Sequence, residues 1–154
     1  MLTARGEGQA RLAGIALARL EADFEAILFS PKARARQTAE LAGEGLSEWG
    51  GAGLEVHPPL AGDFRAAQAL EAISGCAADG HLLLVGHEPD LTNVIAELTG
   101  ARVDLKKGGL AVVRLEGTRG ELTVLMRPRE LALIAGAPVG GERGGDIAGV
   151  HNLE

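Results

Sequence analysis

The segment covering residues 81–91 constrains the fold of this chain more than any other. Four apolar residues at 82–85 lie between turn-forming residues, and such a short run predicts a strand that is buried on both faces. From Pro89 onward the apolar residues recur at helical spacing. In open α/β sheets, ligands bind where a buried strand ends and a helix follows. His87 lies at this junction, and Gly86 before it allows close approach of the backbone.

A second strand–loop–helix junction lies earlier in the chain. Residues 26–29 form another short apolar run, and Pro31 suits the first turn of a helix that extends to about Leu46. The start of a helix carries a partial positive charge, and the Arg34 guanidinium adds a planar fork that matches phosphate oxygens. Gln37, three residues later, shares its helix face. The pattern indicates an anion site, although an ordinary solvated basic helix would look the same.

The remaining segments complete an α/β pattern. We expect a first helix over residues 2–20, with Thr3 as its N-cap. After the second helix we expect a glycine-rich connection at 43–53, an edge strand at 54–57, a helix at 64–73 and a helix from 89 to 98 that ends before Gly100. The last expected elements are an antiparallel hairpin with strands 109–115 and 121–126 and a short helix at 128–134. The predicted fold is a three-layer α/β/α domain. Its sheet is mixed and mostly parallel, with a C-terminal antiparallel hairpin.

Composition narrows the classes of function. A chain of 154 residues that is 46% hydrophobic suits one domain, which we expect over residues 1–135, with a flexible glycine-rich tail at 136–154. The net charge of -6 and the 3% of aromatic residues argue against a nucleic-acid partner. A single cysteine, Cys76, excludes an internal disulfide and a cysteine-based metal cluster. The single cysteine and the lack of a charged-then-apolar leader fit a reducing cytoplasm best. No apolar run is long enough to span a membrane, so we expect a soluble protein.

The two junctions are more informative together than apart. Arg34 could clamp a phosphoryl group while His87 donates a hydrogen bond to it, provided that the two strand ends converge. Each residue also has an ordinary structural explanation, as a solvated helix residue or a loop histidine. The spacing of these residues does not supply a nucleophile.

Three motifs in this order resemble the histidine phosphatase superfamily, and most of all its SixA group of phosphohistidine phosphatases. They are Leu2-Thr3-Ala4-Arg5-Gly6, Ser30-Pro31 with Arg34-Ala35 and Gln37-Thr38-Ala39, and Val85-Gly86-His87-Glu88-Pro89. The resemblance extends over about residues 2–126. It implies that Arg34 and His87 are catalytic and contact the phosphoryl group. It places Ser30, Gln37 and Gly86 beside them as substrate-binding residues.

The family's nucleophile is missing from this sequence. In the family it is a histidine in an arginine-histidine-glycine (or alanine) motif, which ends a first strand before the segment that begins here at Leu2. Arg5-Gly6-Glu7 matches the later segment instead, and the other histidines (His57, His81 and His151) are better explained as structural or solvated. The family's first strand lies between the strand ending at His87 and the hairpin, so its absence would leave two apolar edges unpaired. We therefore expect the nucleophile upstream of Met1, as the result of a truncated sequence rather than an evolved loss.

The resemblance implies a phosphatase that acts on a phosphohistidine-bearing protein through a phosphohistidine intermediate, with no cofactor and no metal. Two alternatives stay open. A small-molecule phosphomonoesterase would need a general acid, for which Asp63 is loosely placed, although a helix cap explains that residue more simply. An inactive module could instead keep Arg34 and His87 and bind phosphate or phosphohistidine without cleaving it.

Overall fold

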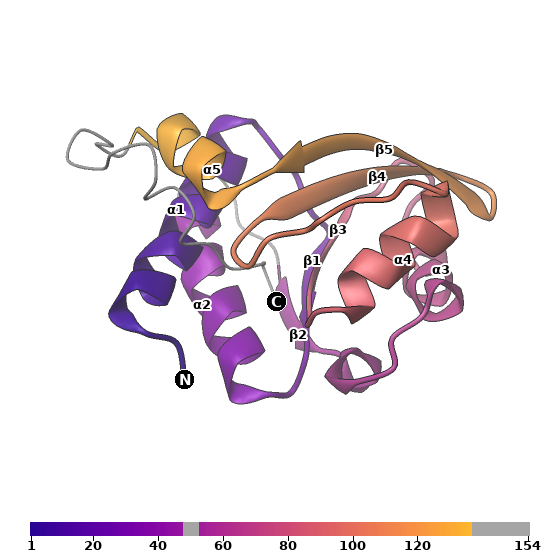
Figure 1. Cartoon of the computed structure of the whole chain (residues 1–154), viewed down its shortest axis with the longest axis horizontal. Coiled ribbons are helices and arrows are strands. Elements are labelled where there is room, and N and C mark those ends of the chain that lie inside the picture. The colour runs from indigo at the N-terminus through magenta and orange to yellow at the C-terminus, as the bar shows by residue number, and fades with distance from the viewer. Residues whose placement is uncertain (48–52, 137–154) are drawn as a thin grey trace.

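The computed structural model describes residues 1–47 and 53–136 of the chain. A parallel sheet has the strand order β2-β1-β3, with β1 at Ala26–Phe29, β2 at Gly53–Val56 and β3 at Leu82–Val85. A separate antiparallel hairpin joins β4 (Leu110–Glu116) to β5 (Arg119–Met126), as Figure 1 shows. Strands predicted from short apolar runs are therefore confirmed. The turn of the hairpin is shorter than predicted, because β4 and β5 extend to Glu116 and Arg119, which pair.

Helices cover both sides of the parallel sheet, which confirms the three-layer α/β/α fold. Figure 1 shows α1, α2 and α5 on one side and α3 and α4 on the other. Their bounds are α1 Ala4–Arg19, α2 Ala33–Ser47, α3 Ala66–Ser74, α4 Asp90–Thr99 and α5 Pro128–Ile134, and a short 3-10 helix spans Pro58–Ala61. Within residues 1–47 and 53–136, no helix has the length and apolar character needed to cross a membrane.

The core is divided by the sheet into two apolar clusters. Alternate residues of a strand face opposite sides, and β1 follows this rule: Ile27 and Phe29 belong to one cluster and Leu28 to the other. In β3, Leu83 and Val85 are buried in the first cluster. Leu82 and Leu84 are half-buried against the second. The prediction that residues 82–85 form a strand covered on both faces is thus confirmed.

Helix α2 ends at Ser47, close to the end near Leu46 that the sequence predicts. The predicted glycine-rich connection overlapped this helix from residue 43, and residues 43–47 belong to the helix. A Cβ atom on Gly45 would lie 2.7 Å from the Ile15 backbone nitrogen of α1, so the missing side chain allows the two helices to touch. Tertiary packing therefore outweighs the low helix propensity of glycine here. Residues 48–52 of the predicted connection, and residues 137–154 of the predicted tail, lie outside the described residues.

Two of the predicted element boundaries are confirmed and one is wrong. The Thr3 hydroxyl accepts a hydrogen bond from the Gly6 backbone nitrogen and caps α1, and Gly100, in the left-handed region, ends α4. Asp63 does not cap a helix, because α3 begins later, with Arg65 as its N-cap. The backbone of Asp63 has a φ of 53°, which places it in the left-handed region. This residue therefore lies in the loop that leads into α3 and is not its cap.

Candidate functional site

The two strand–helix junctions meet at one edge of the sheet. β1 and β3 are parallel neighbours in which Phe29 is opposite Val85, so the residues that follow them leave the sheet side by side. The Ser30 backbone nitrogen donates to the Val85 carbonyl oxygen at 3.0 Å. The side chains also meet, since His87 Nε2 lies 2.7 Å from Ser30 Oγ. The convergence on which the sequence argument depends is thus present in the structure.

Ser30 is wholly buried at this junction. Its hydroxyl oxygen accepts a hydrogen bond from the Lys32 backbone nitrogen at 3.2 Å, which shapes the short loop between β1 and α2. The hydroxyl therefore contacts both the loop before α2 and the histidine after β3. This makes Ser30 the residue that links the two junctions.

Cations surround His87. Burial lowers the pKa of its ring, and the positive charges of Lys32 and Arg34 lower this pKa further, while the Asp90 carboxylate opposes them. The ring is consequently neutral at pH 7, a state in which one nitrogen donates and the other accepts. We did not expect Lys32 to be a site residue from the sequence, although its position two residues after Ser30 and just before the helix could have indicated it. Lys32 and Arg34 are both exposed, so their charges are accessible to an anion.

Gln37 is engaged by the beginning of the chain. Its Oε1 accepts a hydrogen bond from the Leu2 backbone nitrogen at 2.9 Å, and its Nε2 donates to Glu7 Oε1 at 3.2 Å. Both ends of its amide thus tie α2 to the start of α1. Its role as a substrate-binding residue stays a prediction. Arg36, which the helical spacing predicts to point elsewhere than Arg34, lies over the Phe29 ring, 5.3 Å from its centroid.

Gly86 is buried between the side chains of Leu60, which belongs to the second cluster, and Leu91. A Cβ atom at this position would lie 3.2 Å from Leu60 Cδ2 and 3.5 Å from Leu91 Cδ2. Packing alone therefore gives a reason for a glycine between β3 and His87. Its proximity to a substrate stays a prediction.

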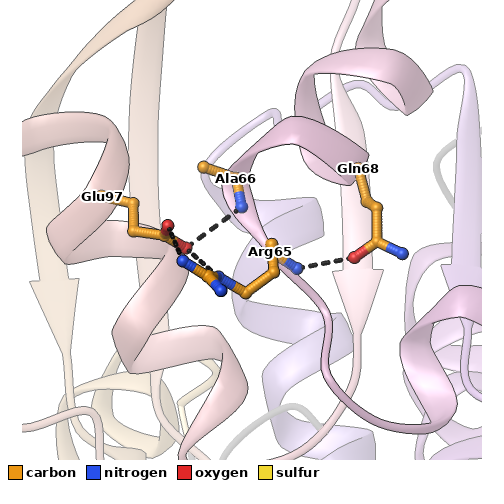
Figure 2. Close-up of polar contacts among 4 residues, drawn as sticks. All are labelled: Arg65, Ala66, Gln68 and Glu97. Carbon is orange, nitrogen blue, oxygen red and sulfur yellow. Dashed lines mark hydrogen bonds and ion pairs between the residues drawn. The ribbon is translucent and has the colours of Figure 1, made fainter.

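The loop that carries Asp63 is held against α4 at two points. Near the start of α4, Asp90 Oδ2 accepts a hydrogen bond from the Phe64 backbone nitrogen at 3.2 Å. Seven residues further along, Glu97 accepts hydrogen bonds from Arg65 Nε at 3.0 Å, from Arg65 Nη2 at 2.7 Å and from the Ala66 backbone nitrogen at 3.3 Å (Figure 2). Asp63 itself is exposed.

This ion pair changes the proton affinity of both partners. The hydrogen bond from Arg65 lowers the pKa of Glu97, and the bond from the Ala66 backbone lowers it further. The pKa of Arg65 is raised, first by the same hydrogen bond. Glu97 therefore remains charged and caps the first N–H of α3 from another helix. The consequence for the site is that α4, which starts just after His87, also fixes the loop of Asp63.

The other histidines of the described residues have structural contacts. The His57 ring packs edge-on against Phe64, with 6.3 Å between the ring centroids, and His81 Nδ1 lies 3.1 Å from the Asp23 carbonyl oxygen. His151 lies outside the described residues. Across residues 1–47 and 53–136, no group of three or more histidine, cysteine, aspartate and glutamate side chains is arranged to hold a metal ion.

Comparisons with known proteins agree with this geometry. The model of the histidine phosphatase superfamily, branch 1, matches residues 1–61. An uncharacterized protein of Picosynechococcus sp. is 34% identical over 146 residues, which cover 84% of each chain. The structure of the protein histidine phosphatase SixA complexed with tungstate superposes with a TM-score of 0.73 at 26% identity, covering 84% of this chain and 85% of the other. An Escherichia coli protein provisionally described as an alpha-ribazole-5'-P phosphatase has a TM-score of 0.63 at 21% identity, with coverage of 83% and 85%.

Proposed function

Because the chain belongs to the histidine phosphatase superfamily, we propose that it takes part in the hydrolysis of phosphohistidine on a protein, through a phosphohistidine intermediate. The observation that carries the proposal is the meeting of a neutral histidine and two cations at the ends of β1 and β3. In this reaction Arg34 neutralises the phosphoryl oxygens, with Lys32 adding positive charge, and His87 donates a hydrogen bond to the transferring group. The related SixA structure was solved with tungstate, a tetrahedral oxyanion of similar shape to phosphate.

The attacking histidine is proposed to precede Met1. Two features of the fold support this placement. Among the described strands, β3 pairs only with β1 and β4 only with β5, so the hairpin is a sheet of its own. The Leu2 backbone nitrogen bonds to Gln37, so residues before it would enter beside the first turns of α2, where Arg34 lies. The first step of the test is to read the genomic DNA upstream of Met1, in frame, for an apolar strand that ends in arginine-histidine-glycine or arginine-histidine-alanine.

The activity test uses the chain extended by that upstream segment, with a phosphohistidine-bearing protein as substrate. Replacing Arg34 with alanine should lower turnover by about 10²-fold or more, because it removes the charge that stabilises the phosphoryl oxygens. Arg36→Ala is the matched control, since Arg36 belongs to the same turn of α2 but lies over Phe29. Equal losses in the two variants would contradict the assignment of Arg34. If a stop codon lies upstream and no such motif precedes Met1, we expect the protein to bind phosphate without turnover, as an inactive binding module would.

A second candidate function is the hydrolysis of a small phosphate monoester. The observation that favours it is the fixed position of the Asp63 loop, which Asp90 and Glu97 hold against α4 next to His87. A phosphatase of that kind is also the provisional description of one structural neighbour. In the same assay, the Asp63→Asn variant distinguishes the two candidate functions. It should reduce turnover of an alkyl phosphate strongly and that of phosphohistidine little, because only the alcohol leaving group needs a general acid.

A further inference from the structure

The buried hydroxyl at the end of β1 has a role that its sequence position did not reveal. We propose that Ser30 is a positioning residue for His87: its hydroxyl donates to Nε2 and thereby keeps the proton of the ring on Nδ1. This inference deepens the proposed function, since it names the nitrogen that donates to a phosphoryl oxygen. It also changes the part given to Ser30, which the sequence placed among the substrate-binding residues.

The donor and acceptor inventory of the hydroxyl carries the argument. A serine hydroxyl has one proton to donate and two lone pairs that accept. The Lys32 backbone nitrogen donates to Ser30 Oγ, so this contact uses a lone pair and leaves the proton. Within the described residues the other hydrogen-bond partner of Oγ is His87 Nε2, at 2.7 Å. The proton of the hydroxyl therefore has Nε2 as its acceptor.

The opposite arrangement would leave a buried donor unsatisfied. If Nε2 carried the proton and donated to Oγ, the serine proton would need another acceptor in a place where the residue has no exposed surface. A buried donor without an acceptor destabilises the folded protein, because it has lost its hydrogen bond to water and gains none in exchange. Donation from Ser30 to Nε2 satisfies both groups, and a neutral ring that accepts at Nε2 must carry its proton on Nδ1.

The groups around the His87 ring keep it neutral, and only a neutral ring carries its single proton on either Nδ1 or Nε2. The pKa of His87 is lowered by burial and by Lys32 and Arg34, with Asp90 acting in the opposite direction. In a doubly protonated ring both nitrogens would donate, so Nε2 would donate to Ser30 Oγ instead of accepting from it. The serine therefore fixes both the rotation of the ring and the identity of its donor. In the proposed reaction, Nδ1–H is the group that hydrogen-bonds to a phosphoryl oxygen.

The test is a direct measurement of the His87 tautomer by NMR at neutral pH, on protein labelled with ¹⁵N at its histidines. In the unsubstituted protein we expect the shift of a protonated nitrogen at Nδ1 and that of an unprotonated nitrogen at Nε2. A proton on Nε2 would overturn the proposal without the need for any variant. No substrate is present, so a failure of the phosphatase proposal, seen as absence of turnover, leaves this result unaffected.

Two variants make the test specific to the serine. Ser30→Ala should shift the tautomer toward Nε2–H and weaken the binding of inorganic phosphate by about tenfold, the effect of one hydrogen bond. Ser30→Thr, which keeps a hydroxyl, should restore the Nδ1–H signal. Thr38→Ala is the matched control, since it removes another buried hydroxyl, from α2. An unchanged tautomer in Ser30→Ala, or an equal change in Thr38→Ala, would contradict the proposal.

Discussion

At the scale of single residues, the candidate site combines a half-buried neutral imidazole with exposed cations. Lys32 and Arg34 lower the pKa of His87, and the same charges attract an anion. The negative charge of a dianion bound beside the ring would offset the effect of these cations on the pKa of His87. Ligand binding and proton binding at His87 are therefore coupled, and each must favour the other.

The first prediction follows from this coupling. Sulfate remains a dianion from pH 5 to 8, so it tests the effect without a titration of its own. We expect saturating sulfate to raise the pKa of His87, and sulfate affinity to increase as the pH falls through that pKa. The ring signals of His87 in NMR report the change. Those of His81, whose ring contacts the Asp23 carbonyl, should not respond to sulfate. A pKa of His87 that sulfate leaves unchanged would separate this residue from the anion site.

The same lowered pKa affects stability. Because the folded protein binds a proton at His87 less readily than the unfolded chain does, the unfolded chain takes up the proton first as the pH falls. The contribution of His87 to the free energy of unfolding is thus complete above its ordinary pKa of 6.5, and is lost as the pH falls from there toward the folded pKa. Bound sulfate should reduce this loss.

At the scale of elements, the contact between α1 and α2 depends on missing side chains. A Cβ atom on Gly14 would lie 2.1 Å from the Ala42 carbonyl oxygen, and one on Gly45 would meet the backbone of α1. Both contacts are with backbone, which cannot rotate away as a side chain could. The position of α2 matters for the site, because its first turn carries Arg34.

The second prediction compares two glycines of the same helix. Gly14→Ala should lower the free energy of unfolding by about 1–3 kcal/mol, since α1 and α2 must move apart to admit the methyl group. Gly8→Ala meets nothing within 4 Å, so it should raise stability by about 0.5–1 kcal/mol through helix propensity alone. Chemical denaturation of both variants measures the difference. A gain in stability from both substitutions would show that the helices do not approach this closely.

At the scale of the whole molecule, the sequence predicted what depends on local pattern and missed what depends on distant contacts. The strands at 26–29 and 82–85 are short apolar runs, and the residues after them converge as parallel neighbours must. The sequence could not decide between helix and connection at residues 43–46, because Gly43 and Gly45 favour a loop until Leu54 is placed against Gly43 and α1 against Gly45. Similarly, neither the engagement of Gln37 by Leu2 and Glu7 nor that of Ser30 by His87 is visible in the spacing of residues.

The last prediction concerns the separation between β3 and the hairpin. Within the described residues, β3 and the hairpin each have a strand edge without a partner, whose backbone groups a further strand could satisfy. The hairpin already contributes Leu110 to one apolar cluster and packs Val113 and Leu115 against the other. If the upstream segment supplies that strand, the extended chain should unfold at higher denaturant and with a steeper transition, because it buries more surface. The control is the same extension with its apolar residues replaced by glycine and serine, which adds chain length but no strand. An extended chain no more stable than this control would mean that the upstream residues do not join the sheet. The proposed nucleophile would then lose its structural support.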